Sequence, residues 1–276
     1  MLGKLLKHEF RATGRLMLPA LGAVLVLAVL ANFSIRFIQV TDSTFLTILF
    51  GLVIGAFGIG MIAAAVMTLV LMILRFYRNL LRDEGYLMHT LPVSVHELVW
   101  SKLIVSLVWF AVTGLVICLV VILTALIQTG TDLGELFAGF PSWAEIRDFL
   151  HEAGLSGGDL WLMGGEMLLA AILSGLVTCL HFYAAMSLGH IFSKDKVLMS
   201  ILFFVGLSIV FSIFQTGASL TMSTQMENLV EGIDTARQGV RLVQGLFARG
   251  LVSELIQAVV LYLITAFGLQ KKLNLA

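Results

Sequence analysis

The chain contains one uninterrupted apolar stretch, residues 45–74, which reads FLTILFGLVIGAFGIGMIAAAVMTLVLMIL. It is thirty residues long and carries no charged side chain. A helix of about 20 residues crosses about 30 Å of hydrocarbon, so this stretch must tilt or project past the headgroups. Lipid cannot satisfy open backbone polar groups, and the stretch is therefore predicted to be a transmembrane helix.

Five further apolar stretches lie on either side of it: residues 16 to about 36, 103–127, 167–192, 197–220 and 251–269. Hydrophobic residues make up 59% of the chain and charged residues 12%, whereas a soluble domain is about a quarter charged. A β-barrel would instead show alternating segments of about ten residues. The sequence predicts an all-α polytopic membrane protein with six transmembrane helices in a single domain, residues 1–276.

The distribution of basic residues predicts the orientation in the membrane. Lys and Arg are enriched in cytoplasmic segments. With both termini inside, all but five of the 17 Lys and Arg fall on the inner side. The five exceptions are Arg36, Arg147, Arg237, Arg241 and Arg249. We therefore expect both the N-terminus and the C-terminus on the cytoplasmic side, with an even number of spans.

Residues 1–15 have the pattern of an amphipathic helix. One face carries apolar residues and Thr13, and the other carries most of the basic side chains, namely Lys4, Lys7, His8, Arg11 and Arg15. This pattern is typical of a helix that lies in the inner headgroup plane. A secretory signal also begins with basic residues, but the regular pattern and the lack of a clean cleavage site favour an uncleaved segment.

Two long segments, residues 128–161 and 221–250, are placed outside. Ser142 and Glu145 form a capping box that predicts a short helix to about Glu152. Apolar residues in the second segment alternate spacings of three and four, which predicts a further helix. Its apolar seam packs either on the ends of the spans or on a second copy of the chain. The seam consists of Met226, Leu229, Ile233, Ala236, Val240, Val243 and Phe247.

Motifs for nucleotide hydrolysis and metal binding are missing from the sequence. Glycines at 51, 55, 58 and 60 lie inside an apolar span and lack the GxxxxGK[ST] pattern that wraps phosphates. We interpret Gly51 and Gly55 as sites of close helix packing. His181 and His190 make a poor metal site without a third ligand, and no HExxH is present. We expect a chain that is not itself an enzyme and holds no metal or cofactor.

Ionisable residues within a membrane indicate function by default. Glu166, Glu254 and Arg36 lie near the outer ends of their spans, where charge costs little because long side chains reach the interface. A proton relay would favour carboxylates near the middle of the membrane, and the spans contain none there. This disfavours a proton-coupled secondary carrier without removing that alternative.

The polar hairpin of residues 75–102 reads RFYRNLLRDEGYLMHTLPVSVHELVWSK and lies on the inner side. Pro92 forces an extended or turn conformation before it, and Ser94 with Glu97 forms a capping box that starts a new helix. Just before Pro92 the hairpin is more apolar than a solvated loop requires, which suggests a docking surface as much as an ordinary loop. The apolar residues are Tyr86, Leu87, Met88 and Leu91.

Three features resemble the membrane subunits of type-two ATP-binding-cassette exporters, the ABC-2-like permeases common in Gram-positive bacteria. Lys4-Leu5-Leu6-Lys7-His8-Glu9-Phe10-Arg11 is similar to the interfacial elbow helix of that family. Asp83-Glu84-Gly85-Tyr86-Leu87 is similar to its first cytoplasmic loop, as are Thr90-Leu91-Pro92-Val93-Ser94 and Ser101-Lys102. Six spans with both ends inside match its topology.

The resemblance implies a permease that forms the transport path in the bacterial plasma membrane. A separate ATPase subunit, which binds ATP and Mg²⁺, would dock on a coupling helix in the hairpin through Glu84, Tyr86, Leu87 and Leu91. The elbow would contact membrane lipid through Lys4, Lys7, Phe10 and Arg11. A second permease chain, identical or related, would complete the path. The candidate path and dimer residues are Gly51, Gly55, Phe203, Phe204, Phe211 and Phe214.

The aromatic wall of the fifth span suits a hydrophobic or amphipathic cargo, such as a lipid, a drug or a peptide. Nucleic acid is not expected as a partner. Residues 221–250 depart from the family pattern, which has short re-entrant helices at that place. Two other functions stay open: a membrane sensor or assembly component whose hairpin binds another cytoplasmic protein, and a secondary carrier.

Overall fold

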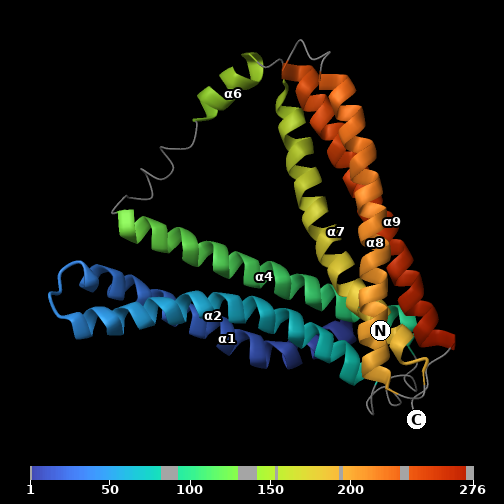
Figure 1. Cartoon of the computed structure of the whole chain (residues 1–276), viewed down its shortest axis with the longest axis horizontal. Coiled ribbons are helices and arrows are strands. Elements are labelled where there is room, and N and C mark those ends of the chain that lie inside the picture. The colour runs from blue at the N-terminus through green and yellow to red at the C-terminus, as the bar shows by residue number, and fades with distance from the viewer. Residues whose placement is uncertain are drawn as a thin grey trace. The chain divides into compact units, whose positions relative to one another are not determined.

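The structure is a computed structural model that describes residues 2–81, 93–129, 142–152, 155–192, 195–230 and 236–271 (Figure 1). Within these residues every regular element is a helix. They are α1 (Leu2–Ile38), α2 (Thr44–Phe76), the π-helical turn η1 (Tyr77–Leu81), α4 (Val95–Thr129), α6 (Trp143–Glu152), α7 (Gly157–Gly189), α8 (Lys196–Val230) and α9 (Ala236–Lys271).

Six of these helices are long and apolar enough to cross a membrane: α1, α2, α4, α7, α8 and α9. This confirms the prediction of an all-helical, multi-pass membrane protein. Each is at least 33 residues long. At 1.5 Å per residue they measure about 50 Å or more, so each extends beyond about 30 Å of hydrocarbon.

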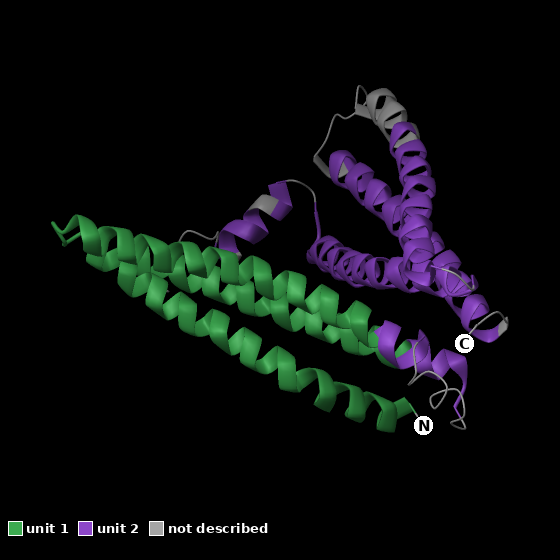
Figure 2. Ribbon diagram, turned by 60° about the horizontal axis from the view of Figure 1, so that its bottom comes forward, with its two compact units in different colours: residues 1–75, 100–140 green, residues 76–99, 141–276 purple. Residues whose placement is uncertain are grey.

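The chain divides into two compact units (Figure 2). Unit 1 consists of residues 1–75 and 100–140, and unit 2 consists of residues 76–99 and 141–276. The two stems of the hairpin, residues 76–81 and 93–99, belong to unit 2, although the helices that carry them lie largely in unit 1. Each unit has its own core.

Unit 1 is a bundle of α1, α2 and most of α4 (Figure 2). Buried residues of α1 recur every three or four positions, which places them on one helical stripe. Between α2 and α4, the hydroxyls of Thr68 and Thr113 share a hydrogen bond of 3.0 Å and satisfy each other inside the apolar core. The main core cluster consists of Met17, Leu21, Val24, Ala64, Met72, Val105 and Trp109.

Unit 2 packs α7 against both α8 and α9. Glycine is required where α7 ends, because a Cβ on Gly189 would lie 2.1 Å from Ser200 Oγ and 2.5 Å from the Ser200 backbone N. A Cβ on Gly268 of α9 would lie 2.9 Å from Ser187 Oγ of α7. Close backbone approach therefore joins α7 to both neighbours at this end. In the most apolar part of α8, within residues 196–220, none of the residues is buried by the rest of the described chain.

The N-terminal segment corrects one predicted boundary. Residues 1–15 were expected to form an interfacial helix separate from the first span, but α1 runs without a break from Leu2 to Ile38. The chain has no proline at the predicted boundary, and Gly14, just before it, is accommodated within the helix. Pro19 removes the donor that would bond to the carbonyl of Arg15, yet the helix continues through it.

The two predicted helices on the outer side differ in outcome. The capping box of α6 is confirmed: the Ser142 N–H donates to Glu145 Oε2 at 2.6 Å, and the Glu145 N–H donates to Ser142 Oγ at 3.2 Å. The helix expected over residues 221–250 is described in two parts: residues 221–230 are helical at the end of α8, and residues 236–250 are helical at the start of α9. Residues 231–235, which join the two parts, lie outside the described residues.

Candidate functional site

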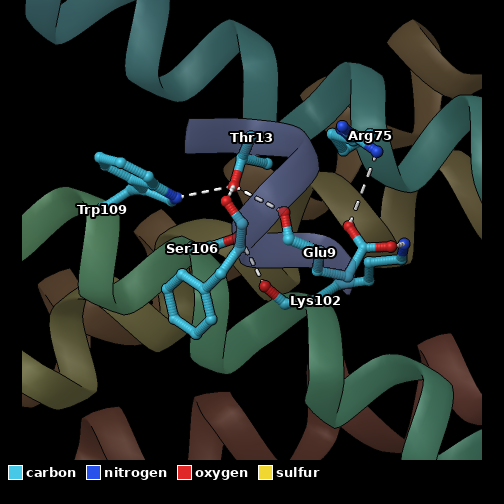
Figure 3. Close-up of polar contacts among 7 residues, drawn as sticks. Glu9, Thr13, Arg75, Lys102, Ser106 and Trp109 are labelled. Carbon is cyan, nitrogen blue, oxygen red and sulfur yellow. Dashed lines mark hydrogen bonds and ion pairs between the residues drawn. The ribbon is translucent and has the colours of Figure 1, made fainter. Parts of the chain in front are cut away.

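A buried group of charges joins the three helices of unit 1 near the base of the hairpin (Figure 3). Glu9 on α1 is only 7% exposed, and Lys102 on α4 is 4% exposed. The Lys102 ammonium donates a hydrogen bond to Glu9 Oε1, forming a direct ion pair. Arg75, at the end of α2, places its guanidinium 3.9 Å from Glu9 Oε2. We refer to Glu9, Arg75 and Lys102 as the ion clasp.

Hydroxyl and indole groups beside the ion clasp are also hydrogen-bonded (Figure 3). The Thr13 hydroxyl donates to the Glu9 carbonyl at 2.8 Å and accepts from Trp109 Nε1 at 2.8 Å. The Ser106 hydroxyl donates to the Lys102 carbonyl at 2.8 Å. Thr13, Ser106 and Trp109 are all buried. A second link, through Thr13 and Trp109, therefore ties α1 to α4 one turn further along.

The energetics of the ion clasp are dominated by burial. Removing one partner of a buried ion pair costs about 3–5 kcal/mol, because it leaves the other charge desolvated and unpaired. Glu9 and Lys102 meet this condition. The side chain of Arg75 is 27% exposed and its contact is longer, so solvent screens it more strongly. Lys102 is therefore the principal partner of Glu9, and Arg75 is an auxiliary one.

The ion clasp lies where the chain passes between the two units. The chain leaves unit 1 after Arg75 and returns to it at Trp100, two residues before Lys102. Glu9 therefore binds the first and the last residue of the hairpin, both of which are far from it in sequence. The arrangement holds the N-terminal part of α1 against both ends of the hairpin.

The first stem of the hairpin is fixed by aromatic contacts within unit 2. Phe76 stacks on Tyr183 of α7 with ring centroids 3.8 Å apart and planes within 8°. Tyr77 meets the ring of His190 edge-on at 5.4 Å. The π-helical turn η1 follows, and such turns are frequent at functional sites. The turn buries Asn79, Leu80 and Leu81.

His190 follows the last residue of α7, and a hydrogen bond holds its imidazole in one orientation. Its Nδ1–H donates to the Met186 carbonyl at 2.9 Å, since a carbonyl can only accept. Burial lowers the pKa of His190, and the nearby charge of Lys196 lowers it further, while the bond to Met186 opposes the shift. The neutral imidazole is the form that packs against Tyr77.

The second stem of the hairpin is held by a cap and a histidine. The predicted capping box is confirmed, since the Ser94 N–H donates to Glu97 Oε2 and the Glu97 N–H donates to Ser94 Oγ, both at 3.2 Å. His96 Nδ1 lies 2.5 Å from Tyr262 Oη on α9, and Gln270 Nε2 lies 3.4 Å from His96 Nε2. An amide nitrogen can only donate, so His96 Nε2 accepts and Nδ1–H donates to Tyr262.

The residues predicted to contact an ATPase, Glu84, Tyr86, Leu87 and Leu91, lie outside the described residues. The predicted elbow residues are described. Lys4, Lys7 and Arg11 are exposed on α1, and Phe10 is half-buried against the core cluster of unit 1. The charged side chains are therefore exposed while the apolar ring packs inward, as the amphipathic pattern predicts.

The predicted path and dimer residues are not all brought together. Gly51 and Gly55 are exposed in unit 1, and a Cβ on either would meet no atom within 4 Å. Against the described residues they make none of the close packing that the sequence suggested. Gly60 does, because its Cβ would lie 3.0 Å from Leu27 Cδ1 of α1. An exposed glycine surface on α2 leaves room for another chain or for lipid.

The four phenylalanines of α8 divide between contact with α7 and exposure. Phe204 and Phe211 surround His181 of α7, with ring centroids 4.9 and 6.1 Å from the imidazole. Phe203 lies 5.8 Å from Phe192, and Phe214 is exposed. Two of the predicted path residues thus pack within unit 2 around a histidine.

Sequence reasoning missed the ion clasp, although one signal pointed to it. Glu9 lies on the apolar face of the N-terminal helix, at the same spacing as Leu2, Leu6 and Thr13. A lone acid on an apolar stripe requires a buried partner. The identity of that partner was not readable, because Lys102 is 93 residues away.

Comparisons with known proteins add no relative: no family model, curated protein or solved structure matches the chain. Among the described residues, no group of three or more His, Cys, Asp and Glu side chains is placed to hold a metal ion. The candidate site is therefore characterised by its own geometry. It has two parts, each within one unit. In unit 1, ion pairs hold the two ends of the hairpin, and in unit 2 aromatic and histidine contacts hold its two stems.

Proposed function

We propose that this chain is the permease subunit of an ATP-binding-cassette exporter in a bacterial plasma membrane. In this proposal both termini are cytoplasmic and two permease chains form the path. Residues 75–102 dock on a separate ATPase subunit, which binds ATP and Mg²⁺ and carries out the chemistry. The ion clasp at the base of the hairpin is the observation that carries the proposal.

A hairpin that transmits force needs a stiff base, and the ion clasp supplies one. Its carboxylate and ammonium are buried and directly paired, so separating them costs several kcal/mol. A displacement of the hairpin therefore moves α1, α2 and α4 together at this end. An ordinary solvated loop has no need for such an attachment.

The stems extend the same reasoning to unit 2. Phe76 and Tyr77 contact Tyr183 and His190 of α7, and His96 contacts Tyr262 of α9. A displacement of the hairpin would reach α7 and α9 through these contacts. The one segment is thus attached to transmembrane helices of both units, as coupling to an external motor requires.

In the proposed mechanism, closure of the ATPase on ATP moves the docked hairpin, and the membrane helices pass between two discrete packings. Packed interfaces favour such alternation because they are bistable rather than continuously deformable. The exposed glycines of α2 and the exposed apolar surface of α8 are the proposed contacts with the second chain.

The proposal is tested by co-expressing the chain with its candidate ATPase and measuring ATP hydrolysis in nanodiscs. We expect the wild-type chain to stimulate hydrolysis and the variant Glu84→Lys with Tyr86→Ala to abolish the stimulation. Glu152→Lys, an exposed reversal on α6, is the matched control and should stimulate as the wild type does. Equal stimulation by all three proteins would count against the proposal.

A further inference from the structure

A cavity of about 310 Å³ lies between α7 and α9 in unit 2. Its volume is within the range of small-ligand pockets. Its walls are apolar except for one carboxylate. The lining residues are Ala170 of α7 and Leu246, Phe247, Gly250, Leu251 and Glu254 of α9.

Glu254 is the unusual member of this lining. Its Oε2 atom is buried and has no hydrogen-bond partner among the described residues. An ionised carboxylate among apolar side chains is costly unless a cation or hydrogen-bond donors accompany it. Intramembrane acids of this kind generally mark a site that receives a proton or a positively charged group.

Among the described residues, no basic side chain of α7 or α9 donates a hydrogen bond to Glu254 Oε2. α7 contains no Lys or Arg. On α9, Arg241 and Arg249 lie about 140° around the helix from Glu254, at about 100° per residue. Both arginines are exposed, and their side chains leave the helix on a different side from that of Glu254.

A second carboxylate continues the same groove. A small adjoining cavity is lined by Glu166 of α7 and Gln244 of α9, and Phe247 lines both cavities. An aromatic ring between two acids suits a cation, because its face attracts positive charge. In the part of the chain that the structure describes, the amide nitrogen of Gln244 is buried without a hydrogen-bond partner. The groove therefore carries polar groups at both ends of an apolar wall.

We infer that this groove is a binding site for a cationic amphiphile. The ammonium or other cationic group of the ligand lies against the Glu254 carboxylate and the ring of Phe247. The apolar body fills the space over Gly250 and Ala170. Charge complementarity selects this occupant over a neutral lipid chain, which would leave the carboxylate uncompensated. The inference does not depend on the proposed exporter function.

The experiment measures binding of tritium-labelled dodecyltrimethylammonium to the full chain in phosphatidylcholine nanodiscs. Empty nanodiscs give the background from partition into lipid. Dodecyldimethylamine N-oxide, which has the same chain and no net charge, is the matched probe. We expect saturable binding of the cation and at least about tenfold weaker binding of the N-oxide, equivalent to about 1.4 kcal/mol.

Two variants locate the site. Glu254→Gln keeps the size of the side chain and removes the charge, and it should weaken cation binding about tenfold. Gly250→Leu fills the cavity, since a Cβ at Gly250 meets no atom within 4 Å, and it should abolish saturable binding. Gly245→Leu is the matched control: Gly245 is also open, and it lies on the opposite face of α9 from Glu254.

The outcomes separate clearly. Loss of binding in the Glu254 and Gly250 variants, with wild-type binding in Gly245→Leu, supports the site. The inference is overturned if the wild type binds no more cation than empty nanodiscs do. It is also overturned if both probes bind equally or if the Glu254 and Gly250 variants bind as the wild type does. Elution of each variant as a single species in gel filtration verifies that it is folded.

Discussion

Glu9 and Glu254 are both carboxylates placed among apolar side chains, but they differ in whether a partner compensates the charge. Glu9 is paired with Lys102 and approached by Arg75. Glu254 lines a cavity, and one of its oxygens has no hydrogen-bond partner within the described ranges of the chain. The paired acid joins helices, whereas the unpaired one has unused binding capacity. The presence or absence of a partner therefore distinguishes a structural charge from a candidate ligand site in this protein.

Lys102→Met is the substitution that we expect to have the largest effect on stability. It leaves Glu9 buried without its principal partner, and we expect the free energy of unfolding to fall by about 3–5 kcal/mol. Denaturant titration in detergent micelles, followed by tryptophan fluorescence, measures the change. The double variant Glu9→Leu with Lys102→Met removes both charges and should recover most of the loss. A double variant as unstable as the single one would show that the two charges do not act as a pair.

The second prediction concerns Glu254, where removing the carboxylate should not lower the free energy of unfolding. Glu254→Leu removes a carboxylate whose desolvation is uncompensated, so the free energy of unfolding should rise by about 1–2 kcal/mol or stay unchanged. The same titration measures it. Glu9→Leu alone serves as the contrasting variant, because it strands Lys102 and should destabilise. Similar destabilisation by both substitutions would remove the distinction between the two acids.

The third prediction concerns the auxiliary partner of Glu9. Arg75→Gln should lower the free energy of unfolding by about 1 kcal/mol or less, since the guanidinium is partly exposed and its contact is long. Raising the salt concentration should shrink this effect more than that of Lys102→Met. A loss as large as that of Lys102→Met would make Arg75 a principal partner.

The smallest expected effect is a pH dependence at His190. Its pKa is lowered in the folded chain, so the unfolded chain takes up a proton more readily. Stability should therefore be intact above about pH 6.5 and decrease as the pH falls below it. Thermal unfolding measured between pH 7.5 and 5.5 should show this slope in the wild type, and His190→Gln should flatten it. An equal slope in both proteins would assign the titration to another group.

Local patterns predicted much of the fold. The apolar runs gave the six membrane-length helices, and the spacing of Ser and Glu gave the starts of α4 and α6. The helix ends were harder to predict from the sequence, because polar residues continue the helices well beyond the hydrocarbon length. α9 begins at Ala236, fifteen residues before the apolar run that predicted it.

The candidate site was predictable only in its position along the chain. The hairpin stood out by composition, but the pairing of Glu9 with Lys102 joins residues far apart in sequence, and no local pattern encodes it. The cavity at Glu254 also depends on two helices, since Ala170 of α7 and Gly250 of α9 both line it. Such three-dimensional neighbours follow from packing, not from the period of either helix.

The central claim is that residues 75–102 bind an ATP-hydrolysing partner. Cross-linking in native membranes tests this claim most directly. Single cysteines placed at positions 84, 86, 87 and 91 would be cross-linked and the captured proteins identified by mass spectrometry, with a cysteine at exposed Trp161 as the control. We predict that the hairpin positions capture an ATPase and that position 161 does not. Failure to capture any ATPase from all four hairpin positions would contradict the account.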